Sequence, residues 1–406
     1  MNRSQLSLYT FANYLPLLSK IILYPLLISK LGSGLWVLIA SMDAFFNIYS
    51  LLVEYGFAIN GIKTLSDRKI NYDNKIKFVS KTIFTQIALF IIFLLPFLAL
   101  SFVFFEKEII KNYFTYFAIY FFLFTCKPVW ILKGFKQFFT LSLAHFISNI
   151  TLLLGVLFFV QESSDFLIFL ILRIVSIAFY YLIAIKKLKE VRFYIKYFNE
   201  IIPSIKQSFD YFLSRLSGVF NTNFIILFAN HFLSENYSFI FILSLKIIDV
   251  FYMGFSFISE YFFVKFNSVS FKNIKKELIR IITLSFGSII FLFLLLKILE
   301  QNPSFEIVKN NIIVVHTLSI LCFVLFFKII NLFFAFFHFL PTNRIKIFNV
   351  ISITCSVIIF CMLYFYSTIY NSYLLFQILC KLLIALHGLI SFFLIINFLK
   401  NKKIVY

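Results

Sequence analysis

Charged side chains inside long apolar segments are the residues of this sequence that could do chemistry. Six cations and two carboxylates lie well inside such segments: Lys20, Arg173, Arg215, Lys246, Lys328, Lys381, Asp43 and Asp249. A charge at the centre of a bilayer costs about 2.5–3.5 kcal/mol on insertion scales, so a retained charge usually faces a bundle interior or an aqueous cavity. If all of these faced lipid, the total cost would reach tens of kcal/mol. We therefore expect them to line a shared interior.

The balance of these charges indicates what such an interior could accept. Cations outnumber carboxylates, and an excess of embedded Lys and Arg is stabilised by an anionic ligand, with phosphate and carboxylate as the groups that these side chains suit. The expected substrate class is an anionic amphiphile. A polyprenyl pyrophosphate that carries a sugar chain fits, since its head would sit in the cavity and its tail in the bilayer.

The elements that must hold these charges are membrane-spanning helices. The chain has 406 residues, of which 62% are hydrophobic, 21% aromatic and only 13% charged, and its mean hydropathy is +0.97. A spanning helix needs about 20 mostly apolar residues. Twelve such segments can be drawn, at 9–29, 35–60, 82–105, 113–133, 138–160, 164–185, 209–232, 237–264, 279–299, 311–339, 346–367 and 373–399. The sequence thus predicts an all-α polytopic membrane protein with twelve transmembrane helices.

The loops between these segments alternate in charge, which predicts their orientation. Lysine and arginine gather in every second loop, for example at 63–81, 186–206 and 265–280, whereas the other loops are short and neutral or acidic. Basic loops lie on the cytoplasmic side of membrane proteins. We therefore expect both termini to be cytoplasmic, in the cell inner membrane. The formal net charge of +20 is then explained by topology and not by nucleic-acid binding.

A basic stretch near the middle of the chain divides it into two halves. We expect an N-terminal six-helix lobe at 1–190, a cytoplasmic linker at 191–208 and a C-terminal six-helix lobe at 209–406, with a central cavity between the lobes. Asp43 precedes Glu54-Tyr55 by 11 residues, and Asp249 precedes Glu260-Tyr261 by the same 11, at a common offset of 206. Equivalent positions in two halves are typical of transporters built from repeats.

Simpler interpretations of the same residues stay open. Lys246 and Asp249 are three residues apart and could neutralise each other on one helix face. Lys328 and Lys381 could reach the interface with long side chains if the spans are misplaced by a turn. Glu54 and Glu260, nearer the segment ends, are interpreted as interfacial carboxylates. The five cysteines and five histidines are scattered, so no metal site and no cofactor is expected.

Short motifs spread along the chain carry a family resemblance. They are Leu31-Gly32, Gly34-Leu35-Trp36, Glu54-Tyr55-Gly56-Phe57, Pro128-x-Trp130-x-x-Lys133-Gly134, Phe212-Leu213-Ser214-Arg215, Lys246-Ile247 and Leu340-Pro341-x-x-Arg344-x-Lys346. In this order they resemble the polysaccharide-unit (O-antigen or capsule repeat) flippases of the multidrug/oligosaccharidyl-lipid/polysaccharide exporter superfamily. The chain departs from that pattern at Leu245, where the family usually has a glutamate.

The resemblance implies a fold and an activity. It implies two six-helix lobes around an alternating-access cavity, and movement of a polyprenyl-pyrophosphate-linked oligosaccharide from the cytoplasmic to the periplasmic leaflet. It marks Arg215 and Lys246 as substrate-contacting residues, while Lys20, Arg173, Lys328 and Lys381 rest on the embedded-charge argument. Coupling to a gradient of H+ or Na+ is expected, with Asp43 and Asp249 as hypothetical coupling residues. The resemblance leaves open an association with polysaccharide polymerase machinery.

Three rival functions share some of these features, and one of them, a lipid scramblase or lipid II-type flippase, differs only in its substrate. A multidrug exporter of the same superfamily would have the same topology, but a pump for cationic drugs requires an acidic or apolar cavity. A membrane polysaccharide polymerase or glycosyltransferase would present a long periplasmic loop with catalytic residues, and every predicted periplasmic loop here is short. The sequence also has no paired carboxylates, Ser/His arrangement or Gly-rich phosphate loop. We therefore expect a transporter and not an enzyme.

Overall fold

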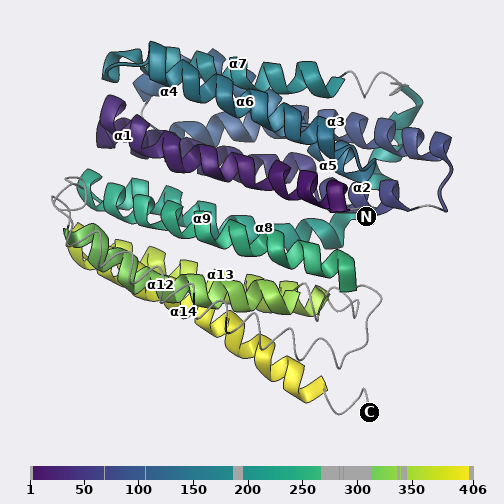
Figure 1. Ribbon diagram of the computed structural model, residues 1–406. Coiled ribbons are helices and arrows are strands. Elements are labelled where there is room, and N and C mark those ends of the chain that lie inside the picture. Colours follow the sequence, from purple (N-terminus) through teal and green to yellow (C-terminus); the bar gives the residue numbers. More distant parts are fainter. Residues whose placement is uncertain are drawn as a thin grey trace. The chain divides into compact units, whose positions relative to one another are not determined.

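The described part of the chain is helical, as predicted. The computed structural model describes residues 3–67, 69–105, 107–185, 195–266, 283, 287, 312–335, 339 and 345–401. Its helices, labelled in Figure 1, are α1 (Arg3–Glu54), α2 (Phe57–Ser66), α3 (Tyr72–Phe104), α4 (Lys107–Thr125), α5 (Val129–Gly134), α6 (Phe138–Phe159), α7 (Phe166–Ile185), α8 (Ile201–Phe232), α9 (Glu235–Phe266), α12 (Ile312–Phe334), α13 (Ile345–Ser367) and α14 (Ser372–Asn401). Two short 3₁₀ helices, η1 (Ser163–Asp165) and η2 (Ile195–Glu200), precede α7 and α8.

The long helix α1 contains the first two predicted spans. Gly32 interrupts it with φ 85° and ψ 170°, a backbone conformation that glycine adopts without a side-chain penalty. Tyr24 and Trp36 lie on opposite sides of this break, yet their ring centroids are 5.9 Å apart. Twelve residues of straight helix would separate them by about 18 Å along the axis. The chain therefore reverses at Gly32, and α1 is a hairpin of two arms.

The span count agrees with the prediction wherever the chain is described. Nine helices, or ten if a bent pair in α8 counts as one span, are long and apolar enough to cross a membrane when α1 is taken as a single helix. With the two arms of α1 taken separately, eleven of the twelve predicted spans correspond to described helices. The remaining one, 279–299, lies outside the described residues apart from 283 and 287.

Several helix ends differ from the predicted span ends, and two of them have clear physical reasons. The helix α3 begins at Tyr72, ten residues before the predicted start, because its polar first turns stay helical outside the apolar stretch. The second arm of α1 ends at Glu54, earlier than the predicted residue 60, because Tyr55 and Gly56 both have positive φ. A β-carbon on Gly56 would lie 2.5 Å from the backbone nitrogen of Phe212, so α8 packs where only glycine fits.

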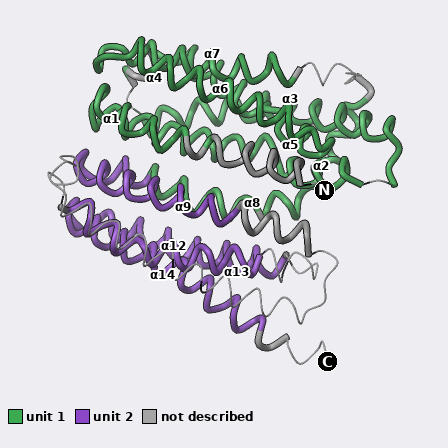
Figure 2. Tube along the Cα trace, viewed as in Figure 1, with its two compact units in different colours: residues 1–227 green, residues 228–406 purple. Residues whose placement is uncertain are grey.

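Two compact units make up the chain, residues 1–227 and 228–406, and Figure 2 shows them in different colours. In the first unit α6 packs against both α1 and α7, while α4 packs against α7 and α1 packs against α3. In the second unit α12 packs against α9 and α14, and α13 packs against α14. The boundary falls inside α8, whereas the sequence-based division places it at the linker 191–208; the two-lobe division of the sequence stays a prediction.

Candidate functional site

The first unit holds an embedded ion pair between Asp43 and Arg173. Asp43 lies on the second arm of α1 and Arg173 on α7, and the guanidinium donates to the carboxylate. Arg173 also donates to the Tyr120 hydroxyl of α4 at 2.5 Å and stacks 4.1 Å from the centre of that ring. The Arg173 side chain is 8% exposed and the Asp43 side chain is 32% exposed. Removal of either partner would leave a costly unpaired charge.

The second unit holds a counterpart between Asp249 and Lys328. The ammonium of Lys328, on α12, donates to the Asp249 carboxylate of α9 at 2.8 Å. It also lies 5.3 Å from the ring centre of Tyr252. The Lys328 side chain is 6% exposed and the Asp249 side chain is 21% exposed. As in the first unit, the cation is buried more deeply than the carboxylate.

The acids of the two pairs occupy equivalent positions in the sequence, but their cations come from different helices. Asp43 and Asp249 are related by the sequence offset of 206, and each lies on the second span of its half. Arg173 lies on the sixth span of the first half, whereas Lys328 lies on the fourth span of the second half. The sequence offset that suggests an internal repeat therefore relates the two carboxylates but not their cations.

A third ion pair joins Glu54 to Arg215. Glu54 ends α1 and Arg215 lies on α8, and their side chains are 21% and 31% exposed. Beside them the rings of Tyr55 and Phe212 stack with centroids 4.4 Å apart and planes within 7°. The amide of Asn60 on α2 donates to Ser208 on α8 at 3.1 Å. Arg215 is thus part of a junction that fastens the start of α8 to α1 and α2.

The other predicted site residues are placed differently. Lys20 is partly buried on the first arm of α1, Lys246 is partly buried on α9, and Lys381 is exposed on α14. Lys246 does not pair with Asp249, whose ion pair is with Lys328. In the residues that the structure describes, neither Lys246 nor Lys381 makes an ion pair.

Lys127 is an embedded cation that sequence reasoning missed. It follows α4 by two residues, before Pro128, and is partly buried. Its ammonium lies 5.0 Å from the ring centre of Tyr180 and 6.0 Å from that of Phe124. Across the described ranges no carboxylate pairs with it. A census of every cation in apolar windows would have found it, because an aromatic run from 113 to 126 precedes it directly.

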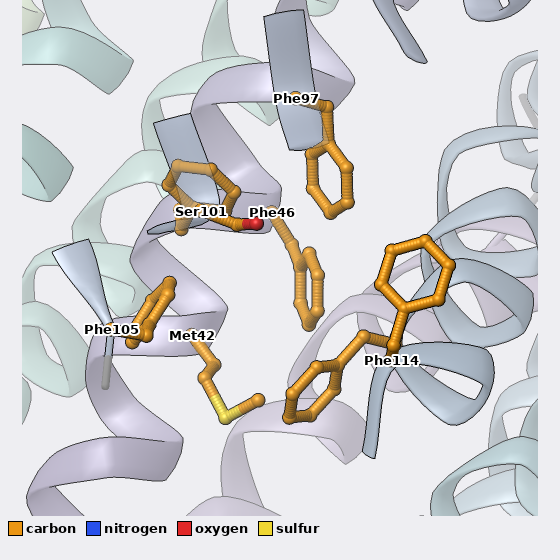
Figure 3. A pocket seen from close by; sticks show the side chains of 8 residues that line it. Met42, Phe46, Phe97, Ser101, Phe105 and Phe114 are labelled. Atoms are coloured by element: carbon orange, nitrogen blue, oxygen red, sulfur yellow. The ribbon is translucent and has the colours of Figure 1, made fainter. Parts of the chain in front are cut away.

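An apolar pocket adjoins the Asp43 pair. Its lining comes from α1, α3, α4 and the residue after α3: Met42, Phe45, Phe46, Phe97, Ser101, Phe105, Phe114 and Phe117. Figure 3 shows aromatic rings around most of it, with the Ser101 hydroxyl as the single oxygen among the labelled side chains. That hydroxyl donates to the Leu98 carbonyl at 2.7 Å. The pocket therefore presents no charged group to a ligand, and apolar side chains surround it.

Histidine, cysteine and acidic side chains are scattered over the part of the chain that is described. No group of three or more His, Cys, Asp or Glu side chains comes together there. All five cysteines are free thiols. The described chemistry is therefore that of ion pairs and unpaired lysines inside a helical membrane protein.

Comparison with known proteins defines the fold. No family model matches the sequence, and no curated protein matches it. A crystal structure of the eukaryotic MATE transporter AtDTX14 superposes with a TM-score of 0.62, covering 96% of this chain and 96% of that chain at 11% sequence identity. The chain is thus a multi-pass helical membrane protein with the fold of a MATE transporter.

Proposed function

We propose that this protein is a flippase that moves a polyprenyl-pyrophosphate-linked oligosaccharide from the cytoplasmic to the periplasmic leaflet by alternating access. A fold like that of a MATE transporter supports the transport part of this proposal. The substrate class rests on the charges inside the spans. The inner membrane, with both termini cytoplasmic, is the location that the basic loops favour.

The observation that carries the substrate class is the pairing of embedded charges. Three carboxylates inside the spans form ion pairs: Asp43, Glu54 and Asp249. In the same described ranges Lys127, Lys246 and Lys381 have no ion pair. These lysines carry embedded positive charge that an anionic head group would compensate.

The same pairing argues against a pump for cationic drugs. A cationic drug needs a carboxylate that is free to bind it, and Asp43, Glu54 and Asp249 each already have a cation. A multidrug exporter has the same fold, so the fold cannot separate the two functions. The left-over lysines favour the anionic substrate.

Ion coupling is proposed at the two aspartates. Each is more exposed than its cation, at 32% against 8% for Asp43 and at 21% against 6% for Asp249. H+ or Na+ could therefore reach the carboxylate while the cation stays buried. Uptake of the ion would weaken the pair between two helices and so link the ion gradient to helix movement.

In the second unit, Lys246 and Lys381 are proposed to contact anionic groups of the substrate. In the first unit, Lys20 is a further candidate cation. A chromosomal deletion should make lipid-linked oligosaccharide accumulate on the cytoplasmic leaflet. Wild-type protein should restore export, and the double variant Lys246→Gln and Lys381→Gln should not, although it reaches the membrane in equal amount. The control is Lys77→Gln, because Lys77 is exposed on the polar start of α3. Unchanged lipid-linked intermediates in the deletion strain, with raised drug sensitivity instead, would overturn the proposal.

A further inference from the structure

Two cation–ring contacts join α4 to α7. One has its cation on α7 and its ring on α4, and in the other the cation follows α4 and the ring is on α7. In one contact Arg173 of α7 lies 4.1 Å from the ring centre of Tyr120 on α4. In the other, Lys127 just after α4 lies 5.0 Å from the ring centre of Tyr180 on α7. The second contact is seven residues further along both segments, which is about two helical turns or 10 Å. The contacts therefore form two tiers between the same two helices.

The cation of the first tier has a carboxylate partner, and the cation of the second tier does not have one among the described residues. Asp43 neutralises Arg173. For Lys127 no ion pair occurs with any residue that the structure describes. A ring face compensates an embedded ammonium only in part, at about 2 kcal/mol or less. The positive charge of the second tier therefore has no carboxylate opposite it among the described residues.

A buried hydroxyl in the same tier lacks a partner. Tyr180 is 0% exposed, and its hydroxyl makes no hydrogen bond, although buried phenols usually do. The ring is fixed in a cluster with Leu132, Leu141 and Ala144, so the hydroxyl is held in place. His145 packs against Tyr180 with ring centroids 5.2 Å apart. An ammonium, a phenol and an imidazole are donors that suit an anion with several oxygen atoms.

The position of this tier matches the direction of transport. Along both α4 and α7 it lies towards the end that carries the basic loops, since Lys133 and Lys136 follow it on one side and Lys186 to Arg192 on the other. That end is the predicted cytoplasmic end. A substrate that is made in the cytoplasm would reach this tier before it reached the Asp43 pair.

We propose that Lys127, Tyr180 and His145 form an anion subsite inside the first unit and that it receives the pyrophosphate group of the substrate. This inference rests on the proposed function, because it takes the substrate class from there. Lys127 supplies the charge, and Tyr180 and His145 supply directional hydrogen bonds. The Asp43–Arg173–Tyr120 tier next to it does not compete for the anion.

Direct binding tests the subsite. The full-length protein in lipid nanodiscs would be titrated with farnesyl pyrophosphate, and separately with inorganic pyrophosphate and farnesol. We expect wild-type protein to bind farnesyl pyrophosphate, Lys127→Gln to bind it at least 10-fold more weakly, and Lys127→Arg to stay within about threefold. Tyr180→Phe should weaken binding severalfold. Lys77→Gln, an exposed lysine outside the tier, should bind as the wild type does.

The outcomes separate the subsite from the function. If Lys127→Gln melts at the wild-type temperature and binds farnesyl pyrophosphate equally well, the subsite is wrong, while the proposed function stands. If farnesol binds as tightly as farnesyl pyrophosphate and Lys127→Gln changes neither affinity, the protein recognises the farnesyl chain and not the anion, and the subsite is again wrong. If wild-type protein binds neither farnesyl pyrophosphate nor inorganic pyrophosphate, both the subsite and the proposed substrate class are overturned. Lys127→Arg shows whether a loss in Lys127→Gln comes from the charge or from a damaged fold.

Discussion

The Nζ atom of Lys328 lies 2.8 Å from a carboxylate oxygen of Asp249, and both side chains are largely buried inside the second unit. This pair joins α9 to α12, two helices whose contacts form much of that unit. It makes the stability of the unit depend on two charges that lie 79 residues apart in the sequence.

Replacing one partner of the Asp249–Lys328 pair should lower the unfolding free energy more than replacing both partners. Asp249→Asn leaves Lys328 buried and charged, which should destabilise the protein by about 3–5 kcal/mol. The double variant Asp249→Asn with Lys328→Met should recover most of this loss, because no charge is then left buried. Thermal unfolding in detergent measures both. A single variant as stable as the wild type would contradict the prediction.

The Tyr120 hydroxyl should stabilise the Asp43–Arg173 pair by a measurable amount. Tyr120→Phe keeps the ring under the guanidinium but removes the 2.5 Å hydrogen bond. A hydrogen bond to a charged group contributes about 1.5–3 kcal/mol. The unfolding free energy should fall by that amount. The matched control is Tyr364→Phe, because Tyr364 is an exposed residue of α13 and its loss of a hydroxyl should have little effect.

A charge exchange tests what Arg215 does. Glu54→Arg and Arg215→Glu each place two like charges together and should lower the melting temperature. Together they should restore it, because the pair is rebuilt in reverse. Export in the exchanged protein then separates two roles: recovered export assigns Arg215 to the junction with α1, and absent export at normal stability assigns it to substrate contact. A double variant less stable than both single variants would contradict the pairing.

Two glycines on or against α8 should respond in opposite ways to alanine. Gly56→Ala would place a methyl group 2.5 Å from the Phe212 nitrogen at a residue with φ 74°, so folded protein should be lost. Gly218→Ala meets nothing within 4 Å and should keep or raise stability, by up to about 1 kcal/mol for a helical position. Membrane abundance and melting temperature report both. Equal behaviour of the two variants would refute the close packing at Gly56.

Sequence patterns predicted the helices well, because apolar length and loop charge are local properties. They also marked Asp43 and Asp249 as equivalent, through spacing alone. They could not predict the partners of these acids. Lys246 is the nearest cation to Asp249 in sequence, but helix packing brings Lys328 to it instead.

The missed role of Lys127 has a similar cause. A lysine next to a proline near a span end reads as part of a loop motif. Only the packing of α4 against α7 places it over the ring of Tyr180. The burial of a hydroxyl without a partner, as at Tyr180, is likewise a property of the packed unit and leaves no trace in composition.

The turn at Gly32 is held by Lys30, whose ammonium donates to the carbonyl oxygens of Val156, Leu157 and Val160 at the end of α6, at 3.1, 2.8 and 2.7 Å. These acceptors are made 126 or more residues after the lysine. At a synthesis rate of about 5–20 residues per second, these carbonyl groups are synthesised roughly 6–25 s after Lys30. During biogenesis the Lys30 ammonium of the first hairpin therefore donates to water or to lipid head groups until the fifth span emerges.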